Sequence, residues 1–290
     1  MQQAKEKKKV RPRQKQQQQP GLEYLMDPLP VFFDGNRTAG DKLKDKVCII
    51  TGGDSGIGKA VAVDFARQSA KIVIVYLNEE RDAKDTKDFI QENFPTDCML
   101  IRSDIRKESN CKKIILQTVK KFERVDVLVN NAGVHYPIKN FEETSAENLL
   151  STFQTNIFSM FWLVKHALPY MQAGSSIINT SSVTAYRGSG HLVDYSATKG
   201  AIVSFTRSLS ANLAERKIRV NGVAPGPVWT PLIAASFDPK HISEFGTDVP
   251  LGRTAQPFEI APAFLFLACN DSEYITGQII HVNGGEIVNG

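Results

Sequence analysis

A tyrosine and a lysine placed four residues apart, Tyr195 and Lys199, are the side chains of this chain best suited to proton chemistry. They fall in a stretch whose pattern predicts a helix, and side chains at i and i+4 lie on one face of a helix. A free phenol ionises at about pH 10, which is too high for easy proton exchange at neutral pH. An adjacent ammonium favours the phenolate, so we expect Lys199 to lower the pKa of Tyr195 and let it act as an acid or base. Taken alone, such a pair is usually an ordinary surface pair.

Polar or backbone-exposing residues follow three of the predicted strands, each at the strand's carboxyl end. These residues are Asn130-Asn-Ala-Gly133, Ser182 and Pro225-Gly226. Parallel strands in an open α/β sheet present their carboxyl ends to the ligand. We therefore expect these residues to gather at one edge of the sheet, together with the tyrosine and the lysine.

A glycine-rich turn, Thr51 to Gly58, lies between an apolar run and a stretch with helical periodicity. Strand, glycine turn and helix in this order build a phosphate site, because the free N–H groups at the helix start face the anion. We expect Gly52 to allow the tight turn, Gly56 to let the backbone approach a pyrophosphate, and Gly58 to bring the helix close to the sheet. The alternative is an ordinary tight strand–helix turn.

Strands and helices alternate along the rest of the chain. We expect strands at 47–50, 72–76, 99–102, 125–129, 175–180, 218–223 and 279–282, and helices at about 79–93, 107–123, 145–171, 194–215 and 257–269. Repeated β-α units with apolar, β-branched strands indicate a parallel sheet covered on both faces. The predicted fold is therefore α/β, a Rossmann-type doubly wound parallel sheet of about seven strands in three layers, with residues 46–290 forming a single domain.

The amino-terminal part differs in composition from this domain. Residues 1–19 carry seven bases and one acid, whereas the remainder carries 28 bases and 30 acids, so the net charge of +4 comes from the arm. We expect residues 1–19 to be a disordered basic arm, because they hold almost no apolar residues. Residues 20–45 contain several prolines and apolar side chains, and we expect an extended arm and lead-in that orders on its own domain or on a neighbouring subunit.

Several classes of protein are disfavoured by the composition. No apolar run reaches the roughly 18 residues that a membrane span needs, and the amino terminus does not resemble a secretory signal. The four cysteines lack metal-binding spacing, so we expect no metal and a reduced, cytoplasmic setting. A contact of the basic arm with nucleic acid or a membrane surface rests on the arm alone, and we do not expect either as a partner.

The motifs resemble the short-chain dehydrogenase/reductase family in order and spacing, over about residues 45–285. The matching elements are Thr51-Gly-x-x-x-Gly-x-Gly58, Asn130-Asn-Ala-Gly133, Asn156, Ser182, Tyr195-x-x-x-Lys199 and Pro225-Gly-x-x-x-Thr230. Gln19-Pro-Gly21 and Met26-Asp-Pro-Leu-Pro30 are similar to a bacterial subgroup with an amino-terminal extension. That subgroup is often described as general aldehyde reductases or glucose/ribitol-dehydrogenase-like proteins.

The resemblance implies an oxidoreductase that transfers a hydride between a nicotinamide cofactor and a small carbonyl or alcohol, which is an aldehyde, a ketone or a polyol. Tyr195 would be the acid/base, and Lys199 would lower its pKa and hold the nicotinamide ribose. Ser182 would donate a hydrogen bond to the substrate oxygen. Asn156 would help order a water that relays protons to Lys199. A nucleotide-binding sensor or scaffold on the same fold is the alternative, and the complete Ser–Tyr–Lys–Asn set argues against it.

The cofactor would contact the glycine turn and several strand ends. The expected contacts are Gly52, Asp54, Ser55, Gly56, Ile57, Gly58, Tyr76, Leu77, Asp104, Ile105, Asn131, Ala132, Gly133, Tyr195, Lys199, Pro225, Gly226, Val228 and Thr230. The choice between NAD and NADP stays open. Tyr76 stands where an acid would bind the ribose hydroxyls of NAD, and Ser55 lacks the positive charge that often favours a 2′-phosphate.

Substrate choice would depend on the apolar stretch at about 227–250, which we expect to be irregular and to cover the substrate. His135 and His191 flank the expected mouth of the site, although a role outside catalysis is the commoner one for such histidines. Trp229 is either a pocket wall or plain packing. The family resemblance also implies a homotetramer, with the helices at 145–171 and 194–215 at one interface.

Overall fold

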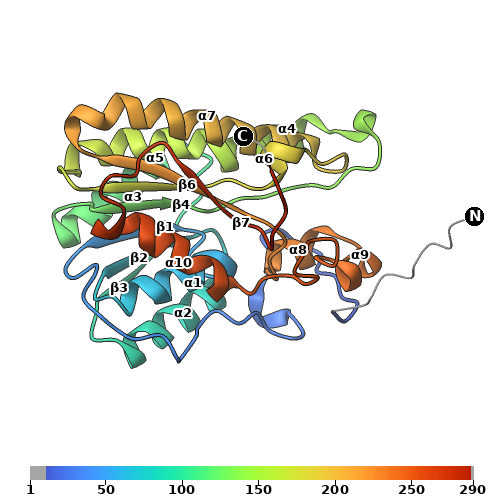
Figure 1. Ribbon diagram of the computed structural model, residues 1–290, viewed down its shortest axis with the longest axis horizontal. Helices are drawn as coiled ribbons and strands as arrows, with labels where there is room; N and C mark the ends of the chain where they lie inside the picture. Colours follow the sequence, from blue (N-terminus) through green and yellow to red (C-terminus); the bar gives the residue numbers. More distant parts are fainter. Residues whose placement is uncertain (1–10, 289–290) are drawn as a thin grey trace, which may run out of the picture.

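The structure is a computed structural model that describes residues 11–288. Within them, seven parallel strands form one sheet in the order β3-β2-β1-β4-β5-β6-β7 (Figure 1). The strands are β1 (Val47–Thr51), β2 (Lys71–Tyr76), β3 (Cys98–Arg102), β4 (Val127–Asn130), β5 (Ser176–Thr180), β6 (Arg219–Pro225) and β7 (Ile279–Val282). The strand order reverses between β1 and β4, which is where an open α/β sheet binds its ligand. The predicted doubly wound fold is confirmed.

Helices cover both faces of this sheet, so the fold has the three predicted layers (Figure 1). One face carries α1 (Gly56–Ala66), α2 (Glu80–Asn93) and α10 (Pro257–Ala268), and the other carries α3 (Glu108–Phe122), α5 (Ser159–Ala167) and α7 (Val193–Leu213). Alternate residues of β1 serve the two cores, since Ile50 packs with Phe65 and Phe264 on the first face while Ile49 packs with Leu163 on the second. This period of two makes β1 apolar throughout.

The predicted helix at 145–171 is not continuous. It consists of α4 (Ala146–Phe153), a π-helical turn η3 (Gln154–Phe158), α5 and a short 3-10 turn η4 (Leu168–Tyr170). Single π-helical turns inside helices are rare and occur mostly at functional sites. The apolar periodicity does not reveal the turn, because Phe153, Ile157, Met160 and Val164 keep the three- and four-residue spacing of a helix through it.

The stretch expected to be irregular contains two short helices, α8 (Pro231–Ser236) and α9 (Pro239–Glu244). Each begins with a proline, whose missing N–H costs nothing in the first turn of a helix. The Asp238 carboxylate accepts hydrogen bonds from the backbone of Lys240 and His241 and so caps α9. The short helix α6 (Thr184–Arg187) follows β5, where the sequence predicts no helix.

The expectation of a disordered arm over residues 1–19 is wrong for residues 11–19, and residues 1–10 lie outside the described part of the chain. The backbone N–H of Gln16 donates to the carbonyl of Ala234 in α8 (2.8 Å), and the Gln16 side chain bonds both the N–H and the carbonyl of Leu22. Arg11 lies 5.1 Å from the Trp229 ring centre. Hydrogen bonds made by glutamine side chains, rather than apolar burial, order this segment, and composition does not register them.

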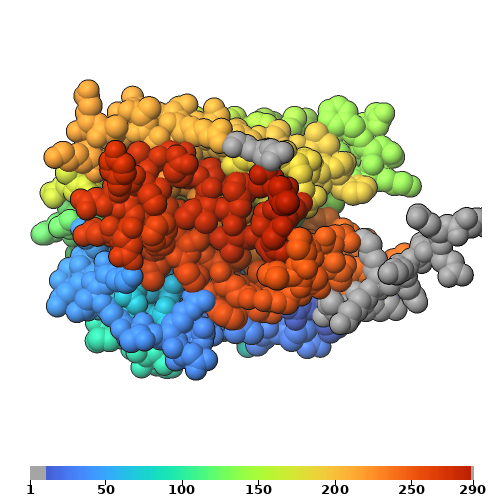
Figure 2. All heavy atoms as spheres, viewed as in Figure 1, coloured from blue at the N-terminus to red at the C-terminus, as the bar shows by residue number. Residues whose placement is uncertain are grey.

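Residues 20–45 lie on their own domain, which is one of the two expected alternatives. Met26 is buried against Trp229, and the rings of Phe32 and Phe33 pack edge-on against Phe89 of α2 at 5.0 and 5.4 Å. In Figure 2 this dark blue segment adjoins the orange α8–α9 region, while the red carboxyl-terminal part lies across the middle of the same face. No helix in residues 11–288 is long and apolar enough to cross a membrane.

Candidate active site

A cavity of about 810 Å³ opens at the carboxyl ends of the strands. The glycine turn, the ends of β4, β5 and β6, the start of α7, helix α8 and the arm at Gln19–Gly21 line it. Of the expected site residues, all except Gly58 and Asn156 line this one cavity. The carboxyl-end rule therefore assembles residues that are up to 178 positions apart in the chain, from Gly52 to Thr230.

Helix α7 presents Tyr195 and Lys199 to the cavity from one face, one turn apart. The Lys199 ammonium lies 5.3 Å from the centre of the Tyr195 ring and donates a hydrogen bond to the carbonyl of Thr180 at the end of β5 (2.7 Å). The Ser182 hydroxyl, two residues further on, accepts hydrogen bonds from the N–H and hydroxyl of Thr184. The structure thus brings the three side chains together at the end of β5.

The proton affinities of this pair differ from the expectation. Burial raises the pKa of Tyr195 to about 12, although the neighbouring Ser182 hydroxyl opposes the shift. Burial also lowers the pKa of Lys199 to about 7, so part of its charge is absent at neutral pH. The pKa of Tyr195 is therefore raised rather than lowered, because burial is the largest influence on both groups. In this structure the phenol is protonated and can donate a proton.

Asn156 lies in the π-helical turn, and its side chain is committed to the backbone beyond β4. Its amide oxygen accepts from the N–H of Val134 (2.9 Å), and its amide nitrogen donates to the carbonyl of the same residue (2.9 Å) and to the hydroxyl of Thr198 (3.2 Å). The side chain therefore positions the chain next to the cavity and also contacts α7. Its expected part in a water relay stays a prediction.

The glycine turn is as tight as its spacing predicts. Gly52 and Gly56 have positive φ values of 62° and 51°, which L side chains rarely adopt. A Cβ atom on Gly58 would lie 1.9 Å from the carbonyl oxygen of Gly52, so no side chain fits there. The amide of Asn131 donates to the carbonyls of Thr51 and Gly52 at 3.0 and 3.3 Å and so ties the turn to β4.

A carboxylate that sequence reasoning missed lies at the start of α1. The N–H of Gly56 donates to Glu23 Oε2 (2.6 Å), and Lys59 Nζ pairs with Glu23 Oε1 (2.7 Å). Both side chains are buried, at 4% and 10% exposure for Glu23 and Lys59. The sequence predicts that the N–H groups at the helix start are free for an anion. The arm instead supplies an acceptor for one of them, the N–H of Gly56. No local spacing signals this contact between residues 33 positions apart.

The part of the cavity beyond β2 and β3 is rich in acids. Glu79 accepts hydrogen bonds from the N–H groups of Leu77 and Asn78, and burial together with the nearby Glu79 raises the pKa of Asp54 to about 8. Asp104 binds Arg106 through two side-chain bonds of 3.0 Å each, so this base is already engaged. This end of the cavity therefore presents acids, and the base beside them is neutralised within its own pair.

The three residues left open by the sequence occupy different environments. His135 is buried, lines the cavity and contacts the Tyr195 ring, whereas His191 is exposed and lies 3.2 Å from the carbonyl of Ile138. Trp229 is fully buried and donates to the carbonyl of Pro28 (2.8 Å), so it packs the loop onto the arm. Phe237 and Phe245 of the same loop line the cavity, as expected for a segment that covers a substrate.

Comparison with known proteins agrees with this site. A family model described as "Enoyl-(Acyl carrier protein) reductase" matches residues 52–286. The chain is 55% identical to the uncharacterized oxidoreductase YhxC of Bacillus subtilis, over 99% of this chain and 100% of the relative. It is 50% identical to NADPH-dependent aldehyde reductase 1, chloroplastic, of Arabidopsis thaliana, over 96% of this chain and 98% of the relative.

Among solved structures, a short-chain dehydrogenase/reductase from Brucella melitensis titled glucose/ribitol dehydrogenase is 33% identical, with a TM-score of 0.78 over 86% of this chain and 100% of that one. Sequence match, fold and the arrangement of the cavity agree. The chain belongs to the short-chain dehydrogenase/reductase family of NAD(P)-dependent oxidoreductases.

Proposed function

We propose that this oxidoreductase reduces the carbonyl group of small polar aldehydes, ketones or sugars, with Tyr195 as the proton donor. The observation that carries the proposal is the convergence of Tyr195, Lys199 and Ser182 in the cavity that also contains the glycine turn. When bound, the nicotinamide cofactor supplies the hydride. The names of the aldehyde reductase from Arabidopsis and the glucose/ribitol dehydrogenase from Brucella support this substrate class.

The chain's own residues have distinct tasks in this proposal. A pKa of about 12 keeps the Tyr195 phenol protonated, as a reduction requires of the group that protonates the nascent alkoxide. Ser182 holds the carbonyl oxygen by a hydrogen bond. Lys199 lies behind the phenol, with its ammonium fixed by the carbonyl of Thr180 (2.7 Å), and stabilises the phenolate that remains after proton transfer.

The acid-rich end of the cavity supports NAD(H) as the preferred form of the cofactor. A 2′-phosphate bound here would face the Glu79 carboxylate and would find no free base, because Arg106 is already paired with Asp104 and Asp54, with a pKa of about 8, is largely uncharged at neutral pH. A phosphate and a neighbouring carboxylate repel each other because both are negatively charged. The ribose hydroxyls of NAD carry no charge and can donate to carboxylates.

The assembly in this proposal is a homotetramer in the cytoplasm. Three large apolar side chains on α4, η3 and α5 are exposed, namely Leu150 at 56%, Phe158 at 41% and Phe161 at 53%, and they support an interface along these helices. The four cysteines are free and buried, which fits a reducing compartment. Analytical ultracentrifugation of the parent and of Phe161→Glu tests the interface: loss of the tetramer in the variant is expected, and a monomeric parent would refute it.

The test of the reaction is oxidation of NADH and NADPH, followed in parallel with a panel of aldehydes, ketones and sugars. We expect turnover with at least one carbonyl class, faster with NADH. Tyr195→Phe should retain cofactor binding and lose turnover. Cofactor binding without turnover of any substrate would instead favour a nucleotide-binding sensor. Turnover by Tyr195→Phe at the parental rate would show that another group donates the proton.

A further inference from the structure

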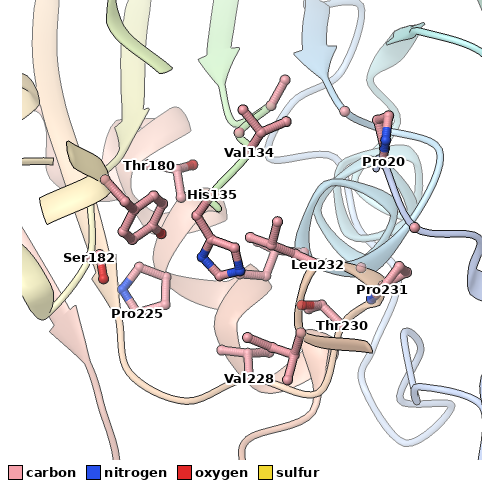
Figure 3. A pocket seen from close by; sticks show the side chains of 18 of the residues that line it. Pro20, Val134, His135, Thr180, Ser182, Pro225, Val228, Thr230, Pro231 and Leu232 are labelled. Carbon is pink, nitrogen blue, oxygen red and sulfur yellow. The ribbon is translucent and has the colours of Figure 1, made fainter. Parts of the chain in front are cut away.

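His135 occupies the centre of the cavity and has no task in the reaction described above. Figure 3 shows its ring between Ser182 and Thr180 on one side and Leu232 and Thr230 on the other. The ring contacts Tyr195 edge-on, at 5.1 Å between ring centres, and Phe237 of the covering loop at 5.4 Å. His135 therefore lies between the proposed proton donor and the segment that covers the substrate.

The polar atoms of this ring are unused. His135 is only 2% exposed, and neither Nδ1 nor Nε2 makes a hydrogen bond of normal geometry, although the backbone of Leu232 is close. Buried polar groups in native proteins are almost always paired, so such an orphan calls for a physical explanation. Burial, aided by the charge of Lys199 and opposed by the Leu232 backbone, lowers the pKa of His135 to about 3, so the ring is neutral at physiological pH.

The backbone on both sides of this ring is held firmly. Val134 is bonded through both its N–H and its carbonyl to Asn156, and the His135 carbonyl accepts from Gln19 Nε2 of the arm (2.5 Å). Two distant segments, the π-helical turn and the arm, therefore hold the backbone that carries this imidazole. A side chain that must meet a ligand atom at a defined position needs a backbone held in this way.

We infer that His135 is a specificity-determining residue that binds a hydroxyl group on the carbon next to the reacting carbonyl, so that the preferred substrates are α-hydroxy aldehydes and ketones. This inference rests on the proposed function and narrows its substrate class. A neutral imidazole offers one N–H donor and one acceptor nitrogen that point in different directions, and a substrate hydroxyl group can pair with either of them because it both donates and accepts. A substrate that lacks the hydroxyl leaves that ring nitrogen unpaired, and sites built for a hydroxyl discriminate strongly against analogues without it.

A matched pair of ketones tests this inference. Hydroxyacetone and 2-butanone have the same shape and differ by a hydroxyl in place of a methyl group. The measured quantity is the ratio of their kcat/KM values, compared between the parent enzyme and variants, because the comparison cancels the difference in intrinsic reactivity. Glycolaldehyde and propanal form a second pair of the same design.

His135→Phe keeps the ring and removes its polar atoms, and His135→Gln restores one donor and one acceptor. We expect His135→Phe to lower the hydroxyl preference at least tenfold, mainly through the hydroxylated substrate, and His135→Gln to recover most of that preference. NADH binding, followed by fluorescence, should stay within about twofold of the parent in both variants and shows that the site is folded.

If His135→Phe lowers kcat/KM for both ketones by the same factor, or lowers neither, their ratio is unchanged and the inference is overturned. An equal fall of both would assign the ring to packing against Tyr195. If the parent reduces these carbonyl compounds and the kcat/KM ratio is the same in the parent and in His135→Phe, only this inference fails. If the parent reduces no carbonyl compound with either cofactor, the proposed function itself fails, and the inference fails with it.

Discussion

The substitution Glu23→Gln tests how firmly the amino-terminal arm holds the start of α1. The glutamine oxygen can still accept the hydrogen bond of the Gly56 N–H, but the negative charge opposite Lys59 is lost. Lys59 is then a buried cation without its closest counter-charge. Removing one partner of a buried ion pair typically destabilises a protein by about 3–5 kcal/mol.

Two neighbours of Lys59 moderate this cost. Its ammonium lies 4.0 Å from the Phe32 ring centre, and the Asp82 carboxylate, which accepts from the N–H groups of Glu23 and Tyr24, provides a more distant negative charge. We therefore expect the lower end of the range, about 3 kcal/mol. With an unfolding entropy of about 2.1 cal/mol/K per residue, the 290 residues give about 0.6 kcal/mol/K, and the melting temperature falls by about 5 °C.

Thermal unfolding measures this shift in melting temperature. All variants are compared at one protein concentration, because the melting temperature of an oligomer depends on concentration. The matched control is Asp271→Asn, which breaks the ion pair between Lys42 and Asp271, whose side chains are about half exposed. Exposed pairs contribute about 0–1 kcal/mol, so the control should shift the melting temperature by less than about 2 °C.

A double variant, Glu23→Gln with Lys59→Met, should regain most of the loss, because no unpaired charge is left buried. Equal melting temperatures for Glu23→Gln and Asp271→Asn would refute the reasoning, and the arm would then be a loosely attached segment. A double variant that is less stable than Glu23→Gln would contradict the assignment of the cost to the orphaned ammonium.

Three further predictions follow from the site. The pKa of Asp54 is about 8, against an ordinary value of 3.8. Between these two pH values the folded protein holds a proton that the unfolded chain releases. The free energy of unfolding therefore falls as the pH rises, by up to about 1.4 kcal/mol for each pH unit. The melting temperature of Asp54→Asn, relative to that of the parent, should therefore rise from pH 4 to pH 8. Parallel plots of melting temperature against pH for the two proteins would contradict the raised pKa. Gly58→Ala, which places a methyl 1.9 Å from the Gly52 carbonyl, should weaken NADH binding more than tenfold in a fluorescence titration, whereas Gly200→Ala, with open space around it, should leave binding unchanged. Asn156→Ala leaves the N–H and carbonyl of Val134 without their partner and should destabilise the protein by about 1–3 kcal/mol while lowering kcat/KM, and unchanged stability in urea would refute its positioning role.

Much of this fold and site could be predicted because the deciding interactions are local or periodic. The strand β7 has the predicted bounds. The buried sheet could be predicted from apolar, β-branched runs, because both of its faces are covered and need such residues. The carboxyl-end rule then places Ser182, Tyr195 and Lys199 near the glycine turn without any knowledge of distances.

The features that escaped prediction depend on contacts between distant segments or on desolvation. The π-helical turn at Asn156 leaves the apolar pattern of its helix nearly intact, and the pairing of Glu23 with Gly56 has no spacing that marks it. The pKa of Tyr195 was expected to fall because an ammonium lies close in sequence, yet the degree of burial sets its direction, and burial is a property of the folded chain.

The arm described above also bears on how this enzyme should be cloned and compared. The side chain of Gln19 bridges two sides of the cavity, because it donates hydrogen bonds to the His135 carbonyl and to the Ser236 hydroxyl. An expression clone that begins at Lys46, immediately before β1, would keep every motif of the reaction but lose Gln19–Gly21, which form one wall of the cavity. Substrate preferences measured on such a clone would belong to a different, more open enzyme.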